Sequence, residues 1–92
     1  MEIEYDINKN SKNISERELS FELVRDFNID TAFTWQDFRY DYDGETRFIS
    51  IGFIGTRLYN LVFTPRGEIL RVISLRKANS REVKKYAKYI KS

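Results

Sequence analysis

Residues 47–75 read RFISIGFIGTRLYNLVFTPRGEILRVISL and form the most strand-like part of the chain. They are dense in Ile, Val, Phe, Tyr and Leu, which pack well on the pleated surface of a sheet. Gly55-Thr56 suits a two-residue hairpin loop with Gly at its first position, and Pro65-Arg66-Gly67 suits a three-residue hairpin. The stretch therefore predicts an antiparallel meander of strands over residues 47–54, 57–64 and 68–75.

Two more strands are predicted before this meander. Residues 2–5 alternate polar and apolar side chains, and residues 31–37 place Phe33 and Trp35 on one parity. Asp43-Gly44 is a dipeptide typical of hairpin turns. We therefore expect the strand within residues 31–37 to join the meander as a fourth antiparallel strand.

Two helices are predicted in the N-terminal third of the chain. Asp6 can cap a first helix that ends near Lys12, because its carboxylate can accept from the first free N–H groups. A second helix, with apolar residues at helical spacing, ends near Phe27. Ser15, which has the form of a capping box, and Ser20 are rival caps for this second helix.

The last helix begins with a capping-box variant at Asn79 and Glu82. One of its faces is basic and carries Lys84, Lys85, Lys88 and Lys91. The predicted order is β-α-α-β-β-β-β-α, an α+β fold whose antiparallel sheet is packed by helices. A chain of 92 residues is the size of one domain, so we expect a single domain over residues 1–92.

The composition excludes several kinds of active site. The chain has no Cys and no His, which excludes a thiol nucleophile, a thiolate zinc site and imidazole acid–base chemistry. No phosphate-binding glycine loop or dinucleotide motif occurs, and we expect neither metal nor cofactor. Apolar runs are far shorter than the ~20 residues that cross a bilayer. The N-terminus is unlike a signal peptide, so we expect a cytoplasmic protein without membrane contact.

Charge is divided unevenly along the chain. Residues 1–46 hold five Lys/Arg and twelve Asp/Glu, a net charge of −7, and residues 47–92 hold eleven and two, a net charge of +9. Such asymmetry is typical of a surface that binds nucleic acid or an acidic partner. The alternative is that the two halves pair with each other, or that the basic side chains form a solvated face.

Arg71 to Ala78, Arg-Val-Ile-Ser-Leu-Arg-Lys-Ala, is the most informative basic segment. Arg71 lies between apolar neighbours, so its charge must be paired or must reach a site. Strict alternation puts Arg71 on one face of the strand and Ser74 and Arg76 on the other. A twist or bulge near Ser74 is therefore required to bring all three together. The alternative for Arg71 is a salt bridge with an N-terminal carboxylate.

Arginine clusters suit phosphate, because the guanidinium is planar, permanently charged and bidentate. A cationic cleft can also stabilise a pentacovalent phosphorus transition state. Without His or Cys, Glu45 or Glu16 is a candidate to accept a proton from a ribose hydroxyl. Aromatic residues that are candidates to stack on exposed bases, or else to pack in the core, are Trp35, Tyr40, Tyr42 and Tyr59.

Several sequence pieces, taken in order from about Ile3 to Tyr86, resemble one family. They are Tyr5-Asp6-Ile7-Asn8-Lys9, Asn13, Ser20-Phe21-Glu22, Glu45 to Gly52, Arg57-Leu58, Arg66-Gly67, Arg71 to Ala78, and Glu82 with Tyr86. The Arg-x-Ile-Ser-x-Arg-Lys-Ala piece is the most specific. The chain thus resembles the BrnT family of small toxins from type II toxin–antitoxin systems.

The resemblance implies a RelE-like fold and a metal-independent endoribonuclease that cleaves RNA and arrests translation. It also implies a BrnA-like ribbon-helix-helix antitoxin, with DNA contacted only through the toxin–antitoxin complex. Glu45 and Glu82 would orient phosphate-facing arginines. The candidate catalytic residues are Lys9, Arg17, Arg71, Ser74 and Arg76, and the candidate substrate-binding residues are Arg47, Lys77, Glu45 and Glu82.

The chain departs from the family pattern before the second helix. The family usually reads Lys-His-Gly there, and this chain has Glu16, Arg17 and Glu18. Arg17 keeps a positive charge but cannot change protonation near neutral pH. Because Glu18 replaces Gly, we expect the backbone of that turn to differ. Tyr5 stands where the family has Trp.

Two other functions compete with the ribonuclease. A catalytically degenerate toxin would keep the antitoxin interface without cutting RNA, and the loss of the family His motivates this reading. A direct DNA-binding protein would use the lysine face of the last helix and show strongly salt-dependent binding to duplex DNA.

Overall fold

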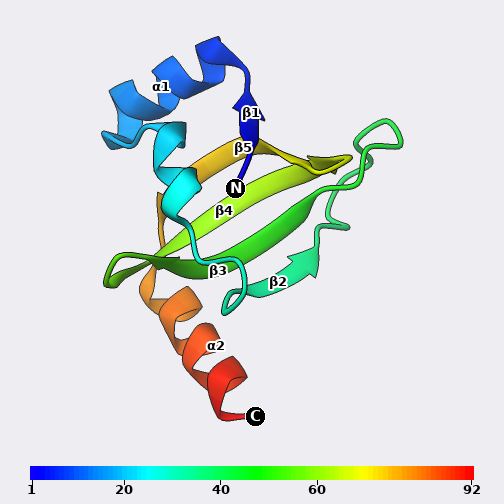
Figure 1. Cartoon of the computed structure of the whole chain (residues 1–92). Helices are drawn as coiled ribbons and strands as arrows, with labels where there is room; N and C mark the ends of the chain where they lie inside the picture. Colours follow the sequence, from blue (N-terminus) through cyan, green and yellow to red (C-terminus); the bar gives the residue numbers. More distant parts are fainter.

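The computed structural model describes all residues, 1–92, as a five-stranded sheet with helical segments before and after it (Figure 1). The sheet order is β1-β5-β4-β3-β2. In Figure 1 the N-terminal helical segments and α2 lie toward opposite ends of the molecule. The elements are β1 (Ile3–Tyr5), α1 (Ile7–Arg17), the 3-10 helix η1 (Phe21–Asp26), β2 (Phe33–Gln36), β3 (Phe48–Ile54), β4 (Arg57–Arg66), β5 (Ile69–Lys77) and α2 (Ser80–Lys91).

Along the chain a strand, two helical segments, four strands and a last helix follow one another, and the sheet that the strands form is mixed. β2, β3, β4 and β5 pair antiparallel, whereas β1 pairs parallel to β5 with Ile3 opposite Leu70 and Tyr5 opposite Val72. The prediction of a wholly antiparallel sheet was therefore wrong at one edge. The long crossover between β1 and β5 permits a parallel pairing, and this register turns Ile3 and Tyr5 toward the hydrophobic core.

The N-terminal helices differ from the prediction in length and type. Asp6 caps α1 as predicted, and its carboxylate accepts from the N–H groups of Asn8 and Lys9. α1 continues to Arg17, so the predicted end near Lys12 and the capping box that begins at Ser15 were wrong. Ser20 is the cap that forms, and it begins a six-residue 3-10 helix, because its hydroxyl accepts from the N–H of Glu22.

Two of the three predicted turns need correction. Gly55-Thr56 forms the predicted two-residue loop. The three-residue Pro65-Arg66-Gly67 hairpin was wrong, because Arg66 still pairs with Ile69 and the loop is Gly67-Glu68. Gly67 has φ of 61°, so it supplies the left-handed residue that this tighter turn needs. Asp43-Gly44 turns the chain inside the loop of residues 37–47 and does not join two strands directly.

The hydrophobic core lies between the sheet and the N-terminal helices. A β-bulge opposite Val62 and Phe63 places Ile73 out of register, so Val72 and Leu75, three residues apart, both face the core. The core consists of Leu19, Phe21, Val24, Phe27, Ala32, Leu61, Phe63, Val72 and Leu75. One face of the sheet is thus covered, and its other face remains for α2 and for the site.

α2 packs against one end of this second face through aromatic contacts. Tyr86 lies edge-on to Phe53, and Tyr89 stacks on Phe33 with ring centroids 4.5 Å apart. The predicted capping box forms, since Asn79 accepts from the N–H of Glu82 while Glu82 accepts from that of Asn79. Neither helix is long and apolar enough to span a membrane.

Candidate active site

An open hollow of about 320 Å³ lies on the second face of the sheet, next to the start of α2. It is bordered by β2, β3, β4, β5, the loop after β2 and α2. Its lining combines apolar, amide, hydroxyl and charged side chains: Trp35, Arg39, Ile49, Asn60, Val62, Ser74, Arg76 and Glu82. A hollow that contains two guanidinium groups beside an indole suits an anionic, aromatic ligand.

Arg76 is fixed in the hollow by a carboxylate and an amide. Its two terminal nitrogens donate to the two carboxylate oxygens of Glu82 at 2.8 Å each, and Asn60 Nδ2 donates to Glu82 Oε2 at 2.7 Å. Burial opposes ionisation of Glu82, but the hydrogen bonds from Arg76, the Asn79 N–H and Asn60 hold its pKa below its ordinary value. Arg76 therefore meets the hollow as an oriented cation.

A second, basic pocket of about 170 Å³ lies between α1 and the part of β5 that follows its pairing with β1. Asn13, which is buried, anchors α1 there by donating to the carbonyl oxygens of Leu19 and Leu75, at 2.9 Å each. Arg17 in turn donates to Asn13 Oδ1 at 2.7 Å. The pocket is lined by Lys9, Lys12, Asn13, Glu16, Arg17, Phe21, Ile73 and Ser74.

Ser74 lines both the hollow and the basic pocket. The bulge at Ile73, which the sequence analysis required, reverses the alternation of β5, so Arg71, Ser74 and Arg76 all lie on the second face. Arg71 nevertheless lines neither depression. It pairs with Glu4, opposite it on β1, at 3.8 Å, which is the alternative that the sequence left open.

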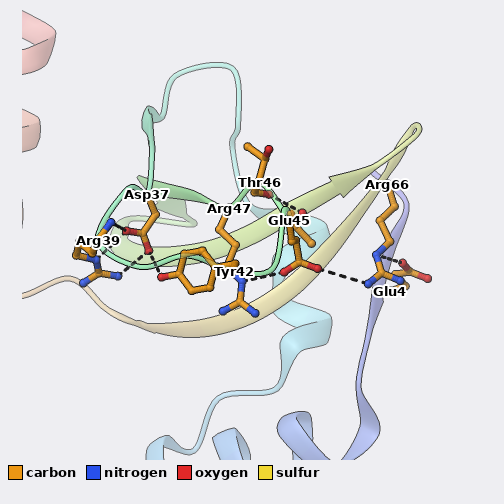
Figure 2. Close-up of polar contacts among 9 residues, drawn as sticks. Glu4, Asp37, Arg39, Tyr42, Glu45, Thr46, Arg47 and Arg66 are labelled. Carbon is orange, nitrogen blue, oxygen red and sulfur yellow. Dashed lines mark hydrogen bonds and ion pairs between the residues drawn. The ribbon is translucent and has the colours of Figure 1, made fainter.

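A network of charged residues orders the loop after β2 (Figure 2). Asp37, whose side chain is only 1% exposed, accepts twice from the Arg39 guanidinium at 2.9 Å and once from the Tyr42 hydroxyl at 2.7 Å. These bonds, above all those from Arg39, hold the pKa of Asp37 well below its usual range. The hydrogen bond that the Tyr42 hydroxyl donates to Asp37 raises the pKa of Tyr42.

The network continues toward β1 through Glu45. Arg47 donates to Glu45 at 2.9 Å, and its guanidinium lies 4.2 Å from the Tyr42 ring centre. The Arg66 guanidinium lies 3.7 Å from a carboxylate oxygen of Glu45 and 3.7 Å from one of Glu4 (Figure 2). Arg47, followed by Arg66, lowers the pKa of Glu45. Because two arginines stabilise its charge, Glu45 is a weak proton acceptor.

The structure thus divides the predicted site residues into groups. Ser74, Arg76 and Glu82 line the hollow, and Lys9 and Arg17 line the basic pocket. Outside both depressions lie Arg47, Glu45, Arg71 and Lys77. Lys77 lies opposite Tyr59 in the pairing of β4 with β5, and its side chain is exposed at the end of β5.

Sequence reasoning missed Asn13, Asp37, Arg39 and Asn60 as parts of the site. Asn60 carried a signal, since it is a polar residue within the apolar run of β4, and Asn13 was noted only as part of the family resemblance. Asp37 and Arg39 are close in sequence, but no pattern showed that the loop they order borders the hollow. No group of three or more acidic side chains that could hold a metal ion occurs in the chain.

The chain matches, over residues 5–82, the family model described as the ribonuclease toxin BrnT of type II toxin–antitoxin systems. It belongs to the BrnT family. The crystal structure of the Brucella abortus ribonuclease toxin BrnT is 30% identical, with a TM-score of 0.65, and the match covers 87% of this chain and 99% of that one. No curated protein sequence matches. The predicted resemblance to BrnT is confirmed, as is the α+β fold.

Proposed function

We propose that this BrnT-family chain is an active endoribonuclease that cleaves RNA without a metal ion and thereby inhibits translation. The observation that carries the proposal is the position of Ser74, which joins the hollow of Arg76 to the basic pocket of Lys9 and Arg17. A sugar–phosphate chain laid across Ser74 meets cations on both sides. Guanidinium and ammonium groups in such a position stabilise the negative charge that develops on a phosphate during cleavage.

The reaction is an intramolecular transfer. The ribose 2′-oxygen attacks the neighbouring phosphorus, and the bond from phosphorus to the 5′-oxygen of the next nucleotide breaks. The products are a 2′,3′-cyclic phosphate and a free 5′-hydroxyl. Arg76 on one side and Lys9 with Arg17 on the other neutralise the phosphate oxygens, and the hydroxyl of Ser74 donates to one of them.

The proton of the 2′-hydroxyl needs an acceptor. Glu45 and Glu82 are each bound by arginine, which makes them weak bases. Glu16 lines the basic pocket and has only one ion pair, with Lys12 at 3.9 Å. We assign Glu16 as the acceptor, and a water molecule or a lysine supplies the proton to the departing 5′-oxygen.

Incubation of the purified chain with RNA in EDTA tests the proposal. We expect fragments that end in cyclic phosphate, and about a hundredfold slower cleavage by Arg76→Ala. Arg81→Ala is the matched control, because Arg81 is an exposed arginine of α2 outside the hollow, and it should cut at the normal rate. Circular dichroism checks that each variant is folded. Absence of cleavage, together with absence of growth arrest on expression, contradicts the proposal.

A degenerate toxin is the second candidate. Both Arg76 and Arg71 are paired with carboxylates, and Arg17, in place of the family His, is bound to Asn13. A chain of this kind would bind its antitoxin tightly, yet expression of the wild type and of Arg71→Ala would leave growth equally unaffected.

We further propose a BrnA-like ribbon-helix-helix antitoxin as the partner, a cytoplasmic location, and contact with DNA only through the toxin–antitoxin complex. The family membership supports this assignment. We also propose that residues 1–92 act as one domain of RelE-like fold, which the order of helices, sheet and closing helix supports.

A further inference from the structure

Trp35 forms one wall of the hollow and is held there by its neighbours. It lies on β2 opposite Ile49 of β3, its indole packs 5.1 Å from the Phe33 ring centre, and Lys85 Nζ lies 4.0 Å from the indole centre. Neither Phe33 nor Lys85 lines the hollow, although Trp35 does. Trp35 thus belongs both to the packing of β2 against α2 and to the lining of the hollow.

The remaining lining of the hollow is suited to a nucleobase. Ile49 and Val62 give it an apolar floor. The Ser74 hydroxyl and the side-chain amide oxygen of Asn60 make no hydrogen bond within the protein, although both residues line the hollow. These groups can pair with the polar edge of a base, while an apolar floor and an indole can contact its flat face.

The loop after β2 contributes a cation to the same hollow. The guanidinium of Arg39 is fixed by its two bonds to buried Asp37, and it lines the hollow together with Trp35. Its free terminal nitrogen makes no hydrogen bond within the protein. An oriented guanidinium in the same lining as an indole can stack on a base or pair with the phosphate that follows it.

We propose that the hollow binds an unpaired nucleobase against Trp35, so that the substrate is single-stranded RNA. This inference rests on the proposed function and adds a base-binding wall beside Arg76. A base within a duplex is stacked and paired on both sides, so it cannot place its face on the indole without leaving the helix. The indole and the apolar floor suit the flat face of a base and the two guanidinium groups suit its phosphate, whereas an apolar peptide would leave those guanidinium groups unmatched.

The fluorescence of Trp35 reports the occupancy of the hollow directly, because Trp35 is the only tryptophan in the chain. The probe is a short single-stranded RNA with a 2′-O-methyl group on every ribose, which binds but cannot be cleaved by 2′-oxygen attack. We expect it to quench the emission of the whole chain, and we expect a duplex of the same strand to quench it little. Because the probe cannot be cut, this measurement does not depend on activity.

Variants locate the base within the hollow. Trp35→Leu should bind the same RNA, measured by fluorescence anisotropy of a labelled strand, about tenfold more weakly, whereas Trp35→Phe should retain most of the affinity. Phe38→Ala is the matched control, because Phe38 is 79% exposed on the same loop and does not line the hollow. It should bind normally.

Four results would overturn the inference: no quenching by the single strand, stronger quenching by duplex RNA or DNA, an equal loss of affinity in Phe38→Ala, or equal weakening by Trp35→Phe and Trp35→Leu. Quenching by purified antitoxin with none by RNA would likewise assign the hollow to a protein partner.

If the chain cuts RNA but Trp35 does not respond, this inference fails and the proposed function stands. If Trp35 responds but the chain does not cut, the hollow binds a base and the proposal of cleavage fails.

Discussion

At the scale of single residues, Glu18 shows a local conflict between sequence and backbone. It ends α1 in the left-handed region, with φ of 59° and ψ of 30°, a backbone conformation that favours glycine. A side chain in this region costs free energy that glycine avoids. We predict that Glu18→Gly raises the free energy of unfolding by about 1 kcal/mol, measured by urea denaturation.

Glu16→Gly is the matched control for this prediction. Glu16 lies inside α1, where glycine lowers helix stability by about 1 kcal/mol, so this variant should be less stable. Equal destabilisation by both glycines would show that the left-handed turn at Glu18 is not strained.

The residue scale also shows which site residues a sequence can reveal. Arg76 and Ser74 were predicted because their types suit phosphate and because strict alternation puts both on one face of the strand, whereas Arg71 needed a bulge to join them. The bulge forms at Ile73, since it lets Val72 and Leu75 both enter the core. Asn13 was not predicted as an anchor, because its partner, the carbonyl oxygen of Leu75, lies 62 positions away in the chain.

At the scale of elements, the loop of residues 37–47 depends on one buried carboxylate. Asp37 binds Arg39 and Tyr42 only in its charged form, so its pKa is lowered in the folded state. The stabilisation is therefore fully present above the ordinary pKa of 3.8 and is lost as the pH falls further. We predict that Asp37→Asn lowers the free energy of unfolding by about 2 kcal/mol at neutral pH, measured by urea denaturation. Below about pH 4 the free energy of unfolding of this variant should fall less steeply than that of the wild type.

Asp41→Asn is the control for this prediction, because Asp41 lies in the same loop, is exposed and binds no other side chain. Its neutral-pH stability should equal that of the wild type. If the free energies of unfolding of the wild type and of Asp37→Asn fall equally steeply below pH 4, Asp37 does not link the loop to acid unfolding.

Some local signals predicted their elements correctly, whereas the Ser15 capping box and the Pro65-Arg66-Gly67 hairpin did not form. The Asn79–Glu82 capping box and the Gly55-Thr56 turn are defined by neighbours in sequence, and both form. The parallel pairing of β1 with β5 joins residues more than sixty positions apart, so no local pattern specifies its direction. η1 is too short for its periodicity to distinguish a 3-10 helix from an α-helix.

At the scale of the whole molecule, the uneven charge is only partly neutralised by folding. Glu4 and Glu45, from the acidic half, pair with Arg66 and Arg71 from the basic half. The basic pocket between α1 and β5 is built differently, because Lys9 and Arg17 form no ion pair there. Folding therefore pairs the two halves of the chain in one region of the surface and leaves Lys9 and Arg17 without ion pairs in another.

The salt dependence of RNA binding distinguishes these regions. Each phosphate that a cation neutralises releases counterions, so the slope of log affinity against log salt falls by about 0.7 per contact removed from a single strand. We predict this change for Lys9→Ala with the uncleavable RNA, measured by anisotropy at about 50 to 200 mM salt. Lys91→Ala removes the same charge from the far end of α2 and should leave the slope unchanged. Equal slopes for the two variants would mean that overall charge attracts the RNA and that the pocket beside Ser74 does not hold its backbone.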